Sequence, residues 1–396
     1  MVLKELDLYY HLFLVCGLWY PVPKDFFSTV AFIAQIIRNL LFILPWFVCI
    51  VSIYFEGFKE SMSGTAFFFV IGLINNVNEI IFYFKRYDTH LIMNMIKRSV
   101  NGHSTMWEQE FIKKRAAILF KLVKIYILIM GSFTVIVYMF LPTLNAFLEY
   151  FDIKTLKIPL PFRGFSLGKL KKDNLDRFLE FGGLMWCYLG IMFYINMQVA
   201  FFFFIHYTAT EAELVCEKIR RLRFVHDERN FLSDKVSKTP DIITLREIIL
   251  HHQFVLKLAR EIINYFGLSM AVQNNIGALC ICLNLISALS ELHRDHSVVI
   301  VSVMTTACMV AQMFSIYYFG HYLVEQSNMI HIRLYQLPWY RLTPSTRKGL
   351  IMIFMQAVKP IEINYQGVAR INLPTFTQAM NAAYSYFTLL KSTIDE

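Results

Sequence analysis

The chain has few charged residues for its length. Asp, Glu, Lys and Arg make up 17% of its 396 residues, whereas 56% are hydrophobic and 16% are aromatic. A soluble globular domain carries about a quarter charged residues, so this balance argues against a soluble protein. The sequence also has no metal-ligand spacing, phosphate-binding loop or nucleophile elbow. The composition therefore predicts a membrane protein and gives no support for an enzyme, a metal site or a bound cofactor.

Processing signals are also scarce. The N-terminal segment carries Glu5 and Asp7, and no small-residue cleavage site follows its apolar run, so no cleavable signal peptide is expected. The seven cysteines lie mostly in or beside apolar stretches, and none falls within 142–178, which argues against an extracellular disulfide framework. The net charge of +9 does not indicate nucleic-acid binding, because membrane topology explains its distribution.

What the chain does have is a series of long apolar stretches. A helix needs about 17–25 predominantly apolar residues to cross a bilayer. Seven such stretches occur, at 30–54, 65–84, 117–141, 179–207, 266–290, 297–323 and 371–392. The predicted fold class is an all-α membrane protein with seven transmembrane helices.

The distribution of Lys and Arg predicts the orientation of these helices. The N-terminal segment and the loops 85–116, 208–264 and 324–369 carry 24 of these residues, against nine in the segments on the opposite side. Positively charged loops are enriched on the cytosolic side of a membrane. We therefore expect a cytosolic N-terminus and, with an odd number of spans, an extracellular C-terminus.

The segments outside the spans differ in kind. Residues 1–26 contain an amphipathic pattern too short to cross a membrane, which favours a helix on the inner surface. Loop 142–178 is rich in Pro and Gly and predicts irregular structure that lids an outward cavity. The arms Glu211–Val225 and Ile242–Phe266 have helical periodicity, so spans four and five are expected to continue as helices into the cytosol. We therefore divide the chain into 1–26, a six-helix bundle at 27–323 that includes cytosolic extensions at 208–264, cytosolic anchor helices at 324–369, and a final helix with the C-terminus at 370–396.

The last apolar stretch is unusual because it contains many polar residues. It carries Thr375, Thr377, Gln378, Asn381, Ser385 and Thr388. Polar groups in hydrocarbon need partners or water, so this pattern fits a helix beside a water-lined path better than a lipid-facing anchor.

Several short motifs along the chain form a recognisable set. They are QMFSIYYFG at Gln312–Gly320, Ser327, Tyr335 before Trp339, LIMIFM at Leu350–Met355 with Pro360, Phe376, and AYSYFTLL at Ala383–Leu390. Two further motifs are GLWYP at Gly17–Pro21 and HQFVL at His252–Leu256. Together they resemble the insect odorant receptor family over the whole length of the chain.

Two related groups of proteins fit less well. Gustatory receptors end their last helix with Thr-Tyr, five residues and Gln-Phe, whereas Tyr386 is followed here by FTLLKST. The shared co-receptor subunit is longer, with a large insertion before span five and a different C-terminal end. The chain therefore looks like an odour-tuning subunit of the family.

The resemblance implies a function and a set of partners. It implies an odorant-gated, nonselective cation channel in the plasma membrane of olfactory sensory neurons, which assembles as a heterotetramer with the co-receptor. Each subunit would contribute a split seventh helix to a central pore. The expected partners are an odorant small molecule, the co-receptor, membrane lipid and permeating cations; no nucleic acid and no cofactor are expected.

The final helix suggests which residues would form the pore. Helical spacing places Tyr386 and Leu389 on one face, together with Thr393. Matched to the family pattern, Leu389 falls at a hydrophobic gate position, and a ring of such side chains would close the pore by dewetting. Ser392 falls where the co-receptor has a glutamine and Thr393 where it has a leucine, so the resemblance implies a more polar outer constriction. The alternative is that Leu389 packs against another helix.

A volatile ligand offers few hydrogen-bonding groups, so its site should be mainly apolar and aromatic. The predicted topology places this site in the outer half of the bundle. The candidates are Phe68, Phe69, Gly72 and Asn75 on span two; Ser132, Phe133, Ile136 and Met139 on span three; Met185, Tyr188 and Met192 on span four; and Val301, Met304 and Thr305 on span six. Asn75, Ser132 and Thr305 are the candidate polar anchors, and the alternative for each is a hydrogen bond to a neighbouring helix.

Other functions remain open at this stage. A metabotropic seven-helix chemoreceptor would need an extracellular N-terminus, and its D/E-R-Y and N-P-x-x-Y signatures do not occur at the expected helices. A gustatory-type receptor channel is the other alternative. A membrane enzyme or transporter would need clustered carboxylates at the midplane, where only Glu79 comes close. The histidines His206, His251, His252, His321 and His331 are expected to bridge helices.

Overall fold

The computed structural model describes residues 65–103, 105–140, 173–222, 245–290, 296–341, 344–367 and 369–395, together with positions 29, 30, 33 and 292. Within these residues the α-helices are α4 (Thr65–Phe84), α5 (Arg86–Gly102), α6 (Met106–Val135), α8 (Asp173–Arg221), α9 (Leu245–Ser290), α10 (His296–Tyr335), α11 (Pro344–Ala357) and α12 (Leu373–Asp395). A π-helical turn, η1 (Ile136–Phe140), follows α6, and a 3-10 turn, η3 (Trp339–Arg341), follows α10. A short hairpin of β1 (Asn364–Tyr365) and β2 (Ala369–Arg370) precedes α12.

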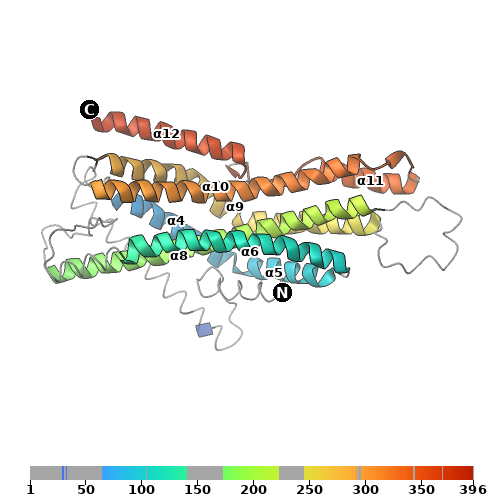
Figure 1. Ribbon diagram of the computed structural model, residues 1–396, viewed down its shortest axis with the longest axis horizontal. Helices are drawn as coiled ribbons and strands as arrows, with labels where there is room; N and C mark the ends of the chain where they lie inside the picture. Colours follow the sequence, from blue (N-terminus) through green and yellow to red (C-terminus); the bar gives the residue numbers. More distant parts are fainter. Residues whose placement is uncertain are drawn as a thin grey trace.

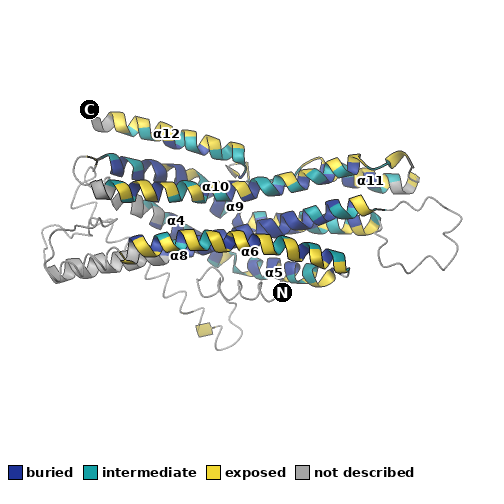
Figure 2. Ribbon diagram, viewed as in Figure 1, coloured by how far each residue is buried: buried dark blue, intermediate teal, exposed yellow. Residues whose placement is uncertain are grey.

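The helices form an elongated bundle in which α12 lies along one side (Figure 1). Among the described helices, α6, α8, α9 and α10 are long and apolar enough to cross a membrane. The apolar part of α8 is 83% buried inside the bundle, whereas that of α6 is 28% buried and that of α10 is 22% buried (Figure 2). Because exposed apolar faces on long helices are stable in lipid, α8 is a central helix and α6 and α10 are peripheral ones. The predicted all-α membrane fold is confirmed.

The predicted spans coincide with helices wherever the structure describes them. Span two matches α4 at both ends, and spans four, five and six fall within α8, α9 and α10. Span three coincides with α6 and η1 up to Phe140, and span seven begins two residues before α12. Predicted span one, segment 1–26, most of loop 142–178 and the break between the arms of 208–264 lie outside the described residues. The split of the seventh helix corresponds to α11 and α12, with the hairpin between them.

The helices extend well beyond the apolar spans. Helix α8 continues without a break from span four to Arg221, and α9 begins at Leu245, so the predicted helical continuations are confirmed. Loop 85–116 was expected only as a connection, but it contains α5 and the first turns of α6. Helix α5 is amphipathic and buries Ile92, Met93 and Ile96 against the bundle. Its charged residues make the segment too polar to be predicted as a membrane span from the sequence.

A buried polar cluster joins the extended ends of three helices. The Glu211 side chain on α8 is fully buried, and its carboxylate accepts hydrogen bonds from Ser99 Oγ of α5 (2.8 Å) and from the Tyr207 hydroxyl. His103 Nε2 of α5 lies 3.2 Å from one carboxylate oxygen, and His251 Nε2 of α9 lies 2.8 Å from the other. A buried charge is stable only when it is fully hydrogen-bonded, so this arrangement fixes α5, α8 and α9 relative to one another.

The hairpin fastens α12 to the bundle through two close approaches. A Cβ atom on Gly320 of α10 would lie 2.5 Å from the carbonyl oxygen of Ile371, and one on Gly267 of α9 would lie 2.6 Å from the Tyr365 ring. Only glycine allows this proximity. Ser327 Oγ of α10 also accepts a hydrogen bond from the Ile361 amide at 2.9 Å.

The start of α12 is specified locally. Asn372 caps the first turn, because the Thr375 amide donates to both Asn372 Oδ1 and the Asn372 carbonyl oxygen at 3.1 Å. Pro374 occupies the first turn, where its missing amide proton costs nothing. The helix therefore begins at a fixed point, directly after the residue that contacts Gly320.

A candidate ligand cavity between five helices

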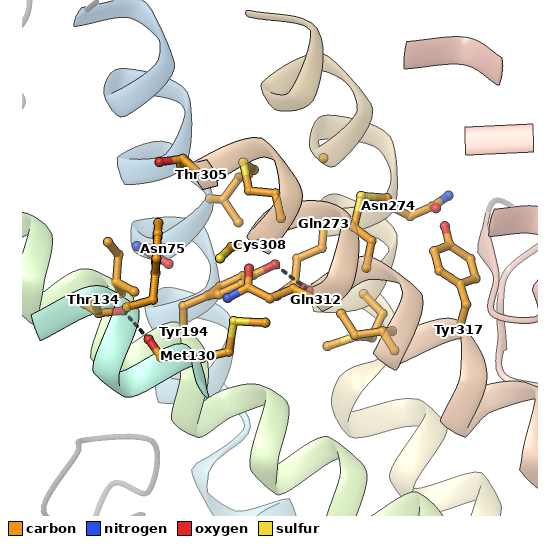
Figure 3. Close-up of a pocket in the computed structure, with 18 of the residues that line it drawn as sticks. Asn75, Met130, Thr134, Tyr194, Gln273, Asn274, Thr305, Cys308, Gln312 and Tyr317 are labelled. Carbon is orange, nitrogen blue, oxygen red and sulfur yellow. Dashed lines mark hydrogen bonds between the residues drawn. The ribbon is translucent and has the colours of Figure 1, made fainter. Parts of the chain in front are cut away.

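A cavity of about 90 Å³ lies between α4, α6, α8, α9 and α10 (Figure 3). One water molecule needs roughly 10–15 Å³, so the cavity has room for a small organic molecule. The residues that line it are Ile74, Asn75, Met130, Phe133, Thr134, Ile191, Tyr194, Met270, Gln273, Asn274, Gly277, Thr305, Cys308, Met309, Gln312, Met313, Ile316, Tyr317 and Ile371.

The wall of the cavity is mainly apolar and deformable. Four methionines, Met130, Met270, Met309 and Met313, contribute side chains from α6, α9 and α10. A thioether on three rotatable bonds adapts to ligands of different outline and is polarizable. Gly277 removes a side chain from the α9 wall, since a Cβ there would lie 3.1 Å from the Met313 sulfur. The site therefore suits an apolar molecule of variable shape.

The polar groups of the wall are neutral. Among the described residues that line the cavity none is charged, and the polar side chains are amides and hydroxyls. The Tyr194 hydroxyl donates to Gln273 Oε1 at 3.5 Å, and Gln273 Nε2 contacts the Met197 sulfur at 3.4 Å. Thr134 and Thr305 donate to carbonyl oxygens of their own helices, at 2.7 Å and 2.8 Å. The cavity therefore provides a few neutral hydrogen-bonding groups in an apolar surrounding, as small-molecule sites commonly do.

The predicted ligand-binding residues fall into three groups in the structure. Asn75, Phe133 and Thr305 line the cavity. The remaining described candidates do not line it: Gly72 is buried, Met192 and Val301 are half-buried, and Ser132, Ile136 and Met304 are exposed. The side chains of Phe68, Phe69, Met139, Met185 and Tyr188 lie outside the described part of the chain. The binding role of every member of this set stays a prediction.

Sequence reasoning missed most of the α9 and α10 wall. Gln273, Asn274 and Gly277 lie on span five, from which no candidate was drawn, and Gln312 and Tyr317 lie deeper along span six than expected. The consecutive amides of Gln273, Asn274 and Asn275 within an apolar span were the available signal. Such groups need a partner inside a membrane, so they mark an interior polar site.

The cavity wall packs against α12 through residues outside that helix. Ile371, which immediately precedes the cap of α12, is part of the cavity wall. The Tyr317 ring, also in the wall, lies 5.7 Å between centroids from the ring of Phe376 on α12. Packed side chains therefore connect the cavity wall to the first turn of α12.

The predicted pore residues lie on an exposed side of α12. Tyr386, Leu389 and Ser392 are exposed, whereas Ala379 and Ala383 face the bundle (Figure 2). The Ser392 hydroxyl donates to the Leu389 carbonyl at 2.7 Å, so its proton is satisfied within the helix. Thr393 is part of α12, but its side chain lies outside the described residues. The pore role of these four residues stays a prediction.

The buried acidic and histidine side chains noted in the sequence pack within the bundle. Glu79 is buried in the bundle, and His206 Nδ1 lies 3.3 Å from Thr210 Oγ1 on the same helix. His251 belongs to the Glu211 cluster. Within the described ranges, no group of three or more His, Cys, Asp or Glu residues is arranged to hold a metal ion.

Known proteins share both the sequence pattern and the fold. A sequence model of the family described as "7tm Odorant receptor" matches residues 60–384. The chain is 31% identical over 113 residues to "Odorant receptor 10" of Aedes albopictus, covering 28% of this chain and 29% of that protein. It is 36% identical over 81 residues to "Odorant receptor Or2" of Anopheles gambiae, covering 20% and 21%. It is 25% identical over 154 residues to "Odorant receptor 49a" of Drosophila melanogaster, covering 38% of each. These alignments thus span well under half of each relative.

A solved structure agrees over nearly the whole chain. The insect olfactory receptor OR5 from Machilis hrabei, solved in complex with eugenol, superposes with a TM-score of 0.74 at 12% identity, covering 98% of each chain. At this identity the likeness concerns the fold.

Proposed function

The chain belongs to the insect odorant receptor family, and we propose that it is the odour-tuning subunit of an odorant-gated, nonselective cation channel. The observation that carries the proposal is the apolar cavity inside the bundle, together with the packing of its wall residue Tyr317 against Phe376 of α12. An apolar cavity of this kind suits a volatile molecule. A terminal helix that carries many polar residues and contacts the cavity wall suits the gate of a channel. No enzymatic activity forms part of the proposal.

In this proposal the odorant binds in the cavity between α4, α6, α8, α9 and α10. Asn75, Phe133 and Thr305 contact it, and the methionines of the wall adapt to its outline. The ligand shifts the channel toward the open state only to the extent that it binds this state more tightly than the closed one. Because Ile371 and Tyr317 belong to both the cavity wall and the α12 contact, their positions are the ones a bound ligand biases.

The pore is proposed to form from α12 of four subunits in a heterotetramer with the co-receptor. The exposed side of α12, with Leu389 and Tyr386, faces the central axis, and a ring at Leu389 closes the path to ions. The N-terminus lies in the cytosol and the C-terminus outside, in the plasma membrane of olfactory sensory neurons. The exposed polar groups of α12 are then wetted by the open pore, which removes the cost of leaving them in lipid.

The decisive experiment is whole-cell current recording during an odorant panel, with and without the co-receptor. Ligand-evoked cation current in co-expressing cells supports the proposal, and its persistence under G-protein blockade separates a channel from a metabotropic receptor. Ligand-evoked signals that need G proteins and carry no direct current would refute it.

A matched pair of glycine variants connects the current to the cavity. Gly277→Leu places a side chain in the cavity and should abolish the response. Gly131→Leu is the control, because a Cβ on Gly131 meets no atom within 4 Å. Surface labelling verifies that both variants reach the membrane. Equal responses of the two variants would contradict this location of the ligand site.

A further inference from the structure

Among the described residues that line the cavity, three polar atoms are buried without a partner: Asn274 Oδ1 on a half-buried residue, and two atoms on residues that are more than nine-tenths buried. Asn75 is 6% exposed and Tyr317 is 2% exposed, yet Asn75 Oδ1 and the Tyr317 hydroxyl have no hydrogen-bond partner among the described residues. Buried polar groups in native proteins are nearly always hydrogen-bonded, because an unpaired one costs free energy. Both atoms belong to the wall of one cavity, so a molecule bound there is the natural partner.

The surroundings of Asn75 lack hydroxyl donors for it. Figure 3 places Asn75 on the same side of the cavity as Thr134 and Thr305. The protons of these two hydroxyls are committed, since Thr134 donates to the Met130 carbonyl and Thr305 to the Val301 carbonyl. What the two threonines still offer is oxygen lone pairs. The unpaired atom at this end is the Asn75 carbonyl oxygen, an acceptor, so a ligand that pairs with it has to supply the proton.

The opposite end has a different character. Tyr317 and Asn274 lie on the far side of Gln273 and Gln312 from Asn75 (Figure 3). The Tyr317 hydroxyl is able to donate a proton, so this end also accommodates a ligand that only accepts a hydrogen bond. In a cavity of about 90 Å³, a ligand with a single ring or a short chain occupies one end at a time. Because the unpaired Asn274 Oδ1 lies at the Tyr317 end too, that end suits a ligand that donates or one that accepts, whereas the unpaired atom at the Asn75 end needs a donor.

Charge and size limit the ligand further. Because the described wall carries no charged residue, a carboxylate or an ammonium ion would be buried there without a counter-charge, which is strongly unfavourable. Asn75 is held on α4 and is surrounded by the bundle, whereas Tyr317 is engaged through its ring with Phe376. The Asn75 end is therefore the one where a ligand binds without disturbing the α12 contact.

We propose that the cavity selects small neutral ligands that carry one hydrogen-bond donor, with the carbonyl oxygen of Asn75 accepting that bond. The inference rests on the function proposed above and specifies the class of odorant. A hydroxyl on a single ring or short chain meets the requirement, whereas a hydrocarbon of the same shape leaves Asn75 Oδ1 unpaired. An ether leaves it unpaired as well, because it has no proton to donate.

The test compares three probes of similar size in the wild-type channel: phenol, toluene and anisole. Phenol and toluene differ by a hydroxyl in place of a methyl group, and anisole offers only an acceptor. Phenol should be active at concentrations about tenfold lower than either of the others, in line with one hydrogen bond to a buried group. Equal potency of phenol and toluene, or a higher potency of anisole, would overturn the inference.

A variant then assigns the preference to one residue. Asn75→Leu keeps the branched outline and the number of side-chain heavy atoms but has no acceptor, so it should bring phenol down to the potency of toluene while toluene keeps its response. Asn275→Leu is the matched control, because Asn275 is exposed on α9 and does not line the cavity. A phenol preference that survives Asn75→Leu would assign the bond elsewhere and refute the role of Asn75.

The two proposals fail in distinguishable ways. If the channel responds to all three probes alike, only the donor preference fails. If surface-expressed receptor with the co-receptor gives no current to any volatile of a broad panel, the proposed function fails. The comparison of the three probes needs no substitution, so it stands even if Asn75→Leu does not reach the surface.

Discussion

The ring of Tyr317 in the cavity wall packs against the ring of Phe376 in α12, with 5.7 Å between their centroids. Phe314 contacts Phe376 on another side, at 5.6 Å with the rings near perpendicular. Aromatic pairs at such distances contribute roughly 0.5–1.5 kcal/mol beyond the area they bury. The wall of the cavity and the start of the terminal helix are therefore parts of one packed unit.

Breaking this contact should uncouple binding from gating. Phe376→Ala removes the partner of Tyr317 without touching the cavity lining, so the maximal current should fall several-fold while the ligand concentration for half-activation changes little. Tyr318→Ala is the control, because Tyr318 is exposed on α10 and its ring packs on Phe314 and Phe319 of the same helix. Concentration–response recordings separate the two parameters. A pure shift in potency with an unchanged maximum would place Phe376 in the binding step.

Gly320 should tolerate no side chain. Gly320→Ala would bring a Cβ to 2.5 Å from the Ile371 carbonyl oxygen, a backbone atom that cannot move aside cheaply. We expect a loss of about 1–3 kcal/mol in stability, as for other overpacked sites. Thermal unfolding of the purified receptor measures it, with Gly131→Ala as the control that meets open space. If both variants unfold at the wild-type temperature, the docking of Ile371 on α10 is looser than described.

Leu389 should control the resting current. Leu389→Ser introduces a polar side chain at the proposed constriction, so the pore should stay wetted and the ligand-independent current of the co-assembled channel should rise several-fold. Lys391→Gln serves as control, because helical spacing places Lys391 roughly opposite Leu389 around α12. Recordings without ligand, normalised to surface expression, provide the measurement. An unchanged leak together with an unchanged ligand response would exclude Leu389 as the gate.

The Glu211 cluster should contribute strongly to stability. Glu211→Gln replaces one acceptor oxygen by an amide NH2 group, which cannot accept the hydrogen bonds of Ser99 or His251. The unfolding free energy should therefore fall by about 3 kcal/mol. Glu217→Gln on the same helix should cost less than about 1 kcal/mol, because Glu217 pairs with Arg220 and Arg221 at the surface. Unfolding in detergent compares the two variants, and similar losses would contradict the assigned difference in burial.

The orientation has its own test. A glycosylation acceptor sequence appended after Glu396 should be modified in cells, and the same sequence placed before Met1 should not, since the charge distribution predicts a cytosolic N-terminus. Modification of the N-terminal tag would reverse the topology and favour a metabotropic receptor.

The elements of the fold were largely predictable because their signals are local. An apolar run long enough to span a bilayer has to be helical, since every backbone group in lipid must be paired within the segment. This is why span two coincides with α4 and why the periodic arms after span four and before span five continue α8 and α9. Helix α5 was not predicted, because its mixture of charged and apolar residues also fits a connecting loop, and only its packing shows which face is buried.

The site was predictable only in part. Asn75 and Thr305 stood out as polar residues in apolar spans, and both line the cavity. Ser132 carried the same signal but lies on an exposed face of α6, and the apolar candidate Met304 lies on an exposed face of α10. Nothing in a single helix distinguishes the face that meets a cavity from the face that meets lipid, because both are apolar.

The sequence by itself determined that the chain is a bundle of membrane helices, where those helices lie in the chain, and that the last one is unusually polar. These properties follow from the hydrophobicity and periodicity of each segment, which are local. Only the tertiary structure decided that Gln273, Gln312 and Tyr317 share one cavity with Asn75, and that Ile371 rests on Gly320. Those relationships join residues far apart in the chain, and the rotation and close approach of packed helices set them.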